Sequence, residues 1–166
     1  ELLRDIRYQL HLSVPGDLHA PILGRVVIEF HLSDNQHPLQ LDFQQTAEHL
    51  LAVNNTAGPI DYEFKEEHLV IPPSALAKGT NRLEIGFIAG DNSLNRNPNY
   101  LYTLFVPDRA RTAFPLFDQP DLKARYQLTL EVPASWEAIS NAPLKAKQTD
   151  EQRASYRFDS SELTSS

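Results

Sequence analysis

The sequence predicts an all-β domain, either a β-sandwich or an open pair of curved sheets. Apolar and polar residues alternate with a period of two in many short runs, and turn-forming residues separate these runs. The 166 residues also include 12 prolines, which interrupt helices. A chain of this length can build one hydrophobic core, so we expect a single domain over residues 1–166.

The first strand is predicted over residues 7–14, RYQLHLSV, where Tyr8, Leu10 and Leu12 alternate with polar side chains. Residues 15–17, Pro-Gly-Asp, then form a turn. The remaining predicted strands are residues 24–33, 39–43, 62–64, 68–72, 82–89, 100–106, 125–132 and 154–159.

Two segments do not follow the strand pattern. Residues 44–55, QQTAEHLLAVNN, favour a helix by propensity, although their position between strands favours a continued β-path. Residues 91–99, DNSLNRNPN, are polar and rich in asparagine, which predicts an exposed loop.

The composition excludes several classes of function. The formal charge is −7, with 15 Lys and Arg scattered among 22 acids, so we expect no nucleic-acid partner. The absence of cysteine excludes disulfides, thiolate zinc sites and cysteine nucleophiles. No run is long enough for a membrane span and no targeting segment is evident, so cytoplasm and bacterial cell envelope both stay open as the compartment.

Six histidines suggest a metal site, but their spacing does not support one. His11 and His31 could lie on the polar faces of neighbouring strands, yet no carboxylate stands at the spacing that would complete three ligands. The HExxH string of helical zinc sites is absent. We therefore expect no metal in this chain. No Gly-x-Ser-x-Gly string and no glycine-rich phosphate loop occurs either.

The stretch FPLFDQPDLKA, residues 114–124, has the composition of a packed corner. Phe114 and Phe117 offer large apolar groups for burial. Pro115 and Pro120 fix the backbone and lack an N–H donor, so this stretch is not a central strand. We expect a buried turn between two strands.

Two aspartates in this stretch leave a functional alternative. Asp118 can accept backbone N–H groups in an Asx-type turn, and the next strand then begins near Lys123. Asp118 and Asp121 could instead form a paired-carboxylate catalytic site. The flanking prolines and aromatic residues favour the turn.

The same stretch resembles the signature of the amino-terminal domain of M1-family zinc aminopeptidases, ARxxFPCFDEPxxKAxFxLTLxxP with SN a few residues later. The matching letters here are Ala110, Arg111, Phe114, Pro115, Phe117, Asp118, Pro120, Lys123, Ala124, Leu128, Thr129, Leu130, Pro133, Ser140 and Asn141. The earlier runs follow in the order that the family uses, so the resemblance covers nearly the whole chain.

The resemblance implies a saddle-shaped all-β domain that packs beside a thermolysin-like catalytic domain of the same polypeptide and borders its substrate cleft. In the parent enzyme, a zinc ion held by two histidines and a glutamate activates water to release N-terminal residues from peptides. Those ligands would lie downstream. Neither HExxH nor a GAMEN-type string occurs in these 166 residues, so we expect no catalytic residue and no cofactor in this chain.

The chain departs from the family pattern at two cleft-lining positions. Where family members commonly carry Gln and then Glu or Gln, this chain has Leu104 and Val106. An apolar pair cannot neutralise the substrate ammonium group. The resemblance implies structural roles for Arg111, Phe114, Pro115, Phe117, Asp118, Pro120 and Lys123.

The end of the chain, YRFDSSELTSS, resembles the start of the last element of the family domain, so we expect the chain to stop within that element. A second hypothesis stays open: a stand-alone β-sandwich binding module, or an M1-like relative without peptidase activity. The sequence that follows Ser166 would distinguish the two hypotheses.

Overall fold

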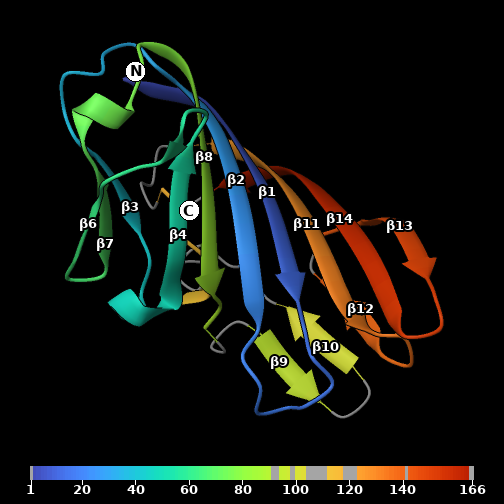
Figure 1. The fold of residues 1–166 in the computed structure, drawn as a ribbon. Helices are drawn as coiled ribbons and strands as arrows, with labels where there is room; N and C mark the ends of the chain where they lie inside the picture. The colour runs from blue at the N-terminus through green and yellow to red at the C-terminus, as the bar shows by residue number, and fades with distance from the viewer. Residues whose placement is uncertain are drawn as a thin grey trace.

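The computed structural model describes residues 2–90, 94–97, 100–103, 112–117, 123–140 and 142–164. These residues form one eight-stranded sheet and two three-stranded sheets (Figure 1). The all-β prediction is confirmed, since the described helical residues are the 3-10 turns Ala47–His49 and Pro73–Ala75 and the two residues 112–113. No helix in the described part is long and apolar enough to cross a membrane.

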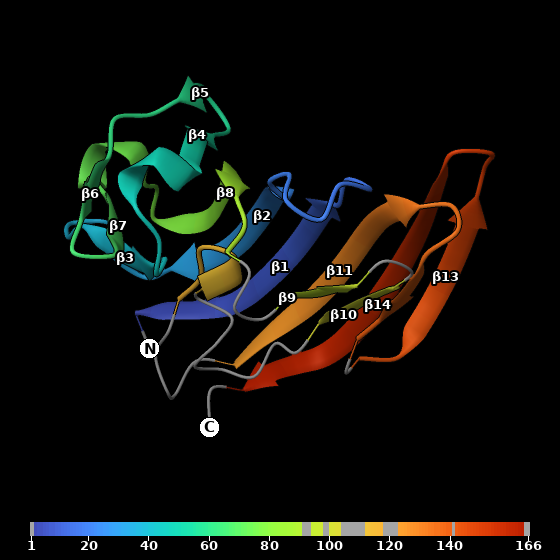
Figure 2. The same ribbon diagram turned by 90° about the horizontal axis from the view of Figure 1, so that it is seen from below.

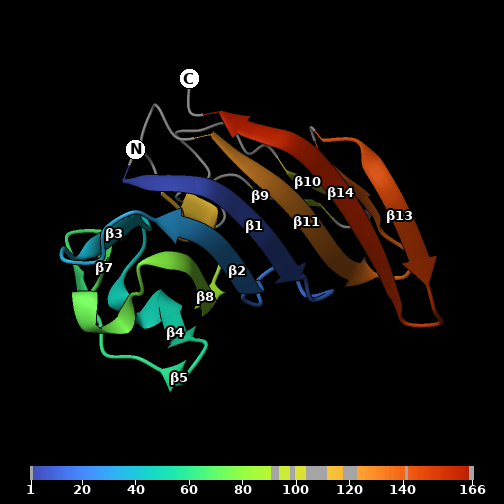
Figure 3. The same ribbon diagram turned by 90° about the horizontal axis from the view of Figure 1, so that it is seen from above.

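The large sheet has the strand order β13-β14-β11-β1-β2-β8-β4-β5 and curves strongly (Figures 1 and 3). Its pairs are antiparallel except β1 with β11, which is parallel. Its strands are β1 (Leu3–Ser13), β2 (Leu23–Leu32), β4 (Leu50–Asn55), β5 (Gly58–Pro59), β8 (Gly79–Ile88), β11 (Lys123–Pro133), β13 (Leu144–Thr149) and β14 (Arg153–Thr164).

The two small sheets have the orders β3-β7-β6 and β12-β10-β9. Their strands are β3 (Leu39–Asp42), β6 (Glu63–Lys65), β7 (His68–Ile71), β9 (Leu94–Asn97), β10 (Tyr100–Thr103) and β12 (Glu137–Ile139). Phe43, directly after β3, packs edge-to-face on Phe87 of β8 at 5.8 Å. The Tyr156 hydroxyl of β14 donates to the carbonyl of Trp136, directly before β12. Both small sheets therefore cover the same face of the large sheet, here called the inner face (Figure 2).

One hydrophobic core fills the space between the inner face and the two small sheets. Along β1, Ile6, Tyr8, Leu10 and Leu12 are buried while the residues between them are more exposed, as the period-two pattern predicts. The core is closely packed where β2 meets β8. A Cβ atom at Gly24 would overlap the ring of Phe87 and touch Leu12, so the strand needs glycine there.

The structure confirms the position of every predicted strand, with shifted ends. The predicted strand 100–106 appears as β10, Tyr100–Thr103, and the residues beyond it lie outside the described part. The strands β5, β9, β12 and β13 were not predicted.

The structure decides one open assignment and contradicts one prediction. Residues 44–55, for which helix and β-path were both open, form a 3-10 turn followed by β4, because pairing with β8 and burial of Val53 outweigh helix propensity. The predicted loop 91–99 contains β9, Leu94–Asn97, which pairs with β10. Arg96 of β9 donates to the carbonyl of Ala20 at 2.6 Å, a tertiary contact that local composition does not reveal.

A short sequence repeat lies side by side in the large sheet. Residues 7–14, RYQLHLSV, and residues 125–132, RYQLTLEV, have six of eight letters in common. In the parallel pair β1–β11, the repeat is in register, so that Arg7 faces Arg125, Tyr8 faces Tyr126 and Gln9 faces Gln127. Identical side chains therefore stand next to each other on both faces of the sheet.

Candidate functional site

The corner formed by residues 112–117 is buried in all six of its residues. Thr112 and Ala113 have helical backbone, and Leu116 forms a single β-bridge. Pro115 between them has no N–H, so burial of its nitrogen leaves no donor unsatisfied. This corner lies inside the core.

Strands β1 and β2 hold the corner through aromatic side chains. The Phe117 N–H donates to the Tyr8 hydroxyl at 2.9 Å, in a buried hydrogen bond between residues 109 positions apart. Tyr8 also meets Phe114 edge-to-face at 6.0 Å, and Phe30 meets Phe117 in the same way at 5.4 Å. Edge-to-face rings add about 0.5–1.5 kcal/mol per pair beyond burial, so the corner is tied to the centre of the large sheet.

The small sheet β3-β7-β6 holds the other side of the corner. Leu116 and Asp42 exchange two backbone hydrogen bonds, of 2.8 and 3.1 Å. The carboxylate of Asp42 lies 2.7 Å from Nδ1 of His68 on β7. One residue thus links the corner to β3 by its backbone and to β7 by its side chain.

Gln45 and Gly90 close the start of the corner. Nε2 of Gln45 donates to the Thr112 carbonyl at 2.8 Å. A Cβ atom at Gly90 would overlap both this amide and the Thr112 carbonyl oxygen. The absence of a side chain at Gly90 therefore allows the corner to approach residues 89–90.

Sequence reasoning singled out the corner but missed its partners Tyr8, Asp42 and Gln45. Tyr8 was expected only as a core residue, from its place in the alternating pattern. Its hydroxyl contact could not be anticipated, since no spacing in the sequence connects residues so far apart.

The residues of the motif fall into two groups. Phe114, Pro115 and Phe117 lie together in the corner, and Lys123 is the first residue of β11. Leu104, Val106, Arg111, Asp118, Pro120 and Asp121 lie outside the described residues.

The histidines do not come together around a metal. His11 lies opposite Arg25, whereas His31 lies opposite Arg4, so the two rings stand at different levels of the β1–β2 pair. His31 Nε2 contacts Arg4, and His11 Nε2 lies 3.4 Å from Glu131. Within the described ranges, no group of three or more His, Asp or Glu side chains could hold a metal ion. These residues therefore do not fit a zinc site.

The hydroxyl of Tyr126 is buried on the inner face beside Tyr8. Burial raises the pKa of Tyr126 well above its ordinary value, because the phenolate would lose hydration. Tyr126 therefore stays protonated and acts as a structural side chain.

A family model, described as the Peptidase M1 N-terminal domain, matches residues 5–166. The chain belongs to this family. Aminopeptidase N of Streptomyces lividans is 29% identical over 148 residues, which cover 82% of this chain and 17% of that protein. Aminopeptidase M1 of Arabidopsis thaliana is 34% identical over 166 residues, which cover 87% of this chain and 19% of that protein.

The M1 N-terminal domain also has the fold of solved relatives. An M1 zinc metallopeptidase from Deinococcus radiodurans superposes with a TM-score of 0.71 and 18% identity, over 95% of this chain and 38% of that chain. The chain spans less than a fifth of the two curated relatives and about two fifths of the solved one. The resemblance read from the motif at residues 110–133 is confirmed.

Proposed function

We propose that this M1 N-terminal domain is a non-catalytic part of a zinc-dependent aminopeptidase that releases N-terminal residues from peptides. It packs on the catalytic domain of the same polypeptide and borders the substrate cleft. The observation that carries the proposal is the family match over residues 5–166. The HExxH string is absent from these 166 residues. In this proposal, a separate catalytic domain carries that string and binds the zinc ion, which activates the water.

The family resemblance implies cleft-lining residues between β10 and the corner, and both flanking elements are well held. Its start is held by pairing of β10 with β9 and β12, and its end by the contacts of residues 112–117 with Tyr8 and Asp42. We propose that Leu104 and Val106 on this segment line the first subsite, and that carboxylates of the catalytic domain hold the substrate amine.

Zinc content and turnover test whether zinc binding and catalysis belong to the catalytic domain and not to this chain. The purified 166-residue chain should bind no stoichiometric zinc and should not hydrolyse aminoacyl p-nitroanilides, whereas the longer polypeptide should do both. Zinc-dependent turnover by the chain alone would contradict the proposal. A longer polypeptide that is folded but without zinc or activity would instead support the binding-module hypothesis.

The cleft position of Val106 is tested by kinetics of the longer polypeptide. The substitution Val106→Glu should lower KM for aminoacyl p-nitroanilides by about tenfold, because a charged hydrogen bond to the substrate ammonium contributes roughly 1.5–3 kcal/mol. Val106→Gln, which adds a polar group without charge, should lower KM by less. If both variants keep the parent KM and melting temperature, Val106 does not border the first subsite.

A further inference from the structure

The outer face of the large sheet, opposite the small sheets, is rich in arginine. Along each central strand, the residues between the buried ones point to this face, such as Gln9 on β1 and Gln127 on β11. The two small sheets both pack on the inner face, so neither of them covers the outer face. Seven of the ten arginines stand on it: Arg4, Arg7, Arg25, Arg82, Arg125, Arg153 and Arg157.

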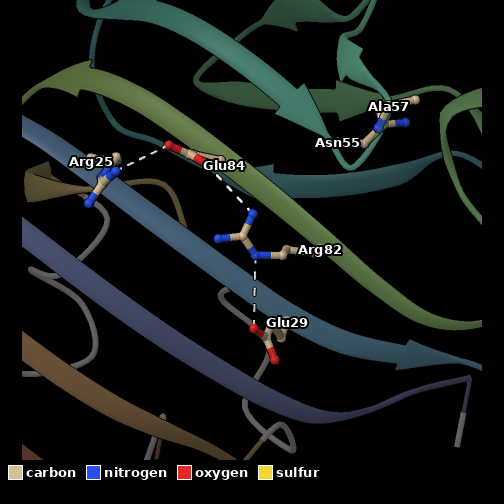
Figure 4. Close-up of polar contacts among 6 residues, drawn as sticks. All are labelled: Arg25, Glu29, Asn55, Ala57, Arg82 and Glu84. Carbon is tan, nitrogen blue, oxygen red and sulfur yellow. Dashed lines mark hydrogen bonds and ion pairs between the residues drawn. The ribbon is translucent and has the colours of Figure 1, made fainter.

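Most of these arginines have partners within the sheet. Figure 4 shows Glu84 between Arg25, at 3.4 Å, and Arg82, at 3.7 Å, and Arg82 also lies 3.9 Å from Glu29. Arg157 lies 3.7 Å from Asp159. Arg4 contacts Asp5 and His31, and Arg153 donates to the carbonyls of Val14 and Glu131. These guanidinium groups are already neutralised or hydrogen-bonded.

Arg7 and Arg125 are different. They face each other across the parallel β1–β11 pair, and both are exposed. Among the described residues, neither guanidinium group has an ion pair or a hydrogen bond. Glu29 lies directly opposite Arg7 across the β1–β2 pair, and Asp159 lies opposite Gln127, but their ion pairs are with Arg82 at 3.9 Å and with Arg157 at 3.7 Å. The next outward pair along the same strands is Gln9 with Gln127.

Two like charges directly opposite on a sheet destabilise it. An anion between them would reverse this effect, because each guanidinium can hold a carboxylate through two parallel N–H donors. The amide side chains of Gln9 and Gln127 add donors one step along the strands. The repeat therefore places the guanidinium groups of Arg7 and Arg125 next to the side-chain amides of Gln9 and Gln127 on the outer face.

We propose that Arg7, Gln9, Arg125 and Gln127, here called the arginine–glutamine patch, bind carboxylates of an acidic segment of a partner protein. The charge balance favours such a segment over a nucleic acid or an anionic membrane. The chain carries a net charge of −7, which repels an extended polyanion over its whole length. A short acidic segment would contact the guanidinium groups of Arg7 and Arg125 without extending over the rest of the chain.

Fluorescence anisotropy of the 166-residue chain with a fluorescein-labelled hexaglutamate peptide tests the patch. Binding should weaken as salt rises. The double variant Arg7→Gln/Arg125→Gln should raise Kd at least about tenfold, since two charged hydrogen-bonding groups are lost. Its melting temperature should rise by about 1–3 °C, because the like-charge contact is removed. This rise would also show that the variant is folded.

Two further variants decide whether the patch acts as a site. The control Arg157→Gln, on the same face but paired with Asp159, should change Kd by less than about twofold. Arg7→Lys/Arg125→Lys keeps the charge but loses the forked geometry, and should raise Kd by about fivefold or more. An equal loss in the Arg157 control, an unchanged Kd in the lysine variant, or tighter binding of inorganic phosphate or single-stranded DNA would overturn the proposal.

Discussion

Replacing Phe114 by alanine should lower the free energy of unfolding by about 3–5 kcal/mol, because the ring is fully buried and its removal leaves a cavity. The loss includes the edge-to-face contact with Tyr8. Urea denaturation followed by fluorescence measures the change, since Trp136 is the single tryptophan and is buried.

Two controls show whether the effect comes from the corner. Phe114→Leu retains most of the apolar volume and should lose much less stability than alanine. Leu23→Ala removes an apolar side chain that is 51% exposed and should change the free energy by no more than about 1 kcal/mol. A loss below about 1 kcal/mol for Phe114→Ala would contradict the description of residues 112–117 as a packed corner.

Replacing Gly90 by alanine should lower the free energy of unfolding by about 1–3 kcal/mol through overpacking. The new methyl group would overlap the Gln45 amide and the Thr112 carbonyl, so the corner must move away from residues 89–90. The hydrogen bond between Gln45 and Thr112 would be strained in the same way. The same denaturation experiment measures the loss.

Gly16→Ala is the matched control for this substitution. A Cβ atom at Gly16 meets only Cγ of Pro133 at 3.6 Å, an ordinary van der Waals contact, so stability should stay within about 0.5 kcal/mol. Equal losses for Gly16→Ala and Gly90→Ala would point to local backbone strain rather than to crowding at the corner.

The sequence predicted those parts of the fold that depend on local pattern. Tyr8, Leu10 and Leu12 were assigned to the core because one face of a strand must be apolar, and the structure buries all three. Strand β4 stayed open against a helix and β9 was missed, because their β-structure comes from pairing with β8 and β10, which overrides helix propensity in one case and polar composition in the other.

The candidate site was predicted only in part, for the same reason. The aromatic residues and prolines of the motif indicated a buried turn, but its partners Tyr8 and Asp42 lie on strands far away in the sequence. The arginine–glutamine patch could not be seen until parallel pairing set the two copies of the repeat in register. Long-range register is decided by the assembled core and not by local residues.

The parallel pairing of β1 with β11 also has a consequence for synthesis of the chain. Residues 6–13 pair with residues 124–131, so β1 lacks its second neighbour until more than a hundred further residues have left the ribosome. Until then, β2 alone protects it, and the other edge of β1 is open to strands of other molecules. The chain must therefore carry an open sheet edge until residues 124–131 have been made, and only β11 closes it.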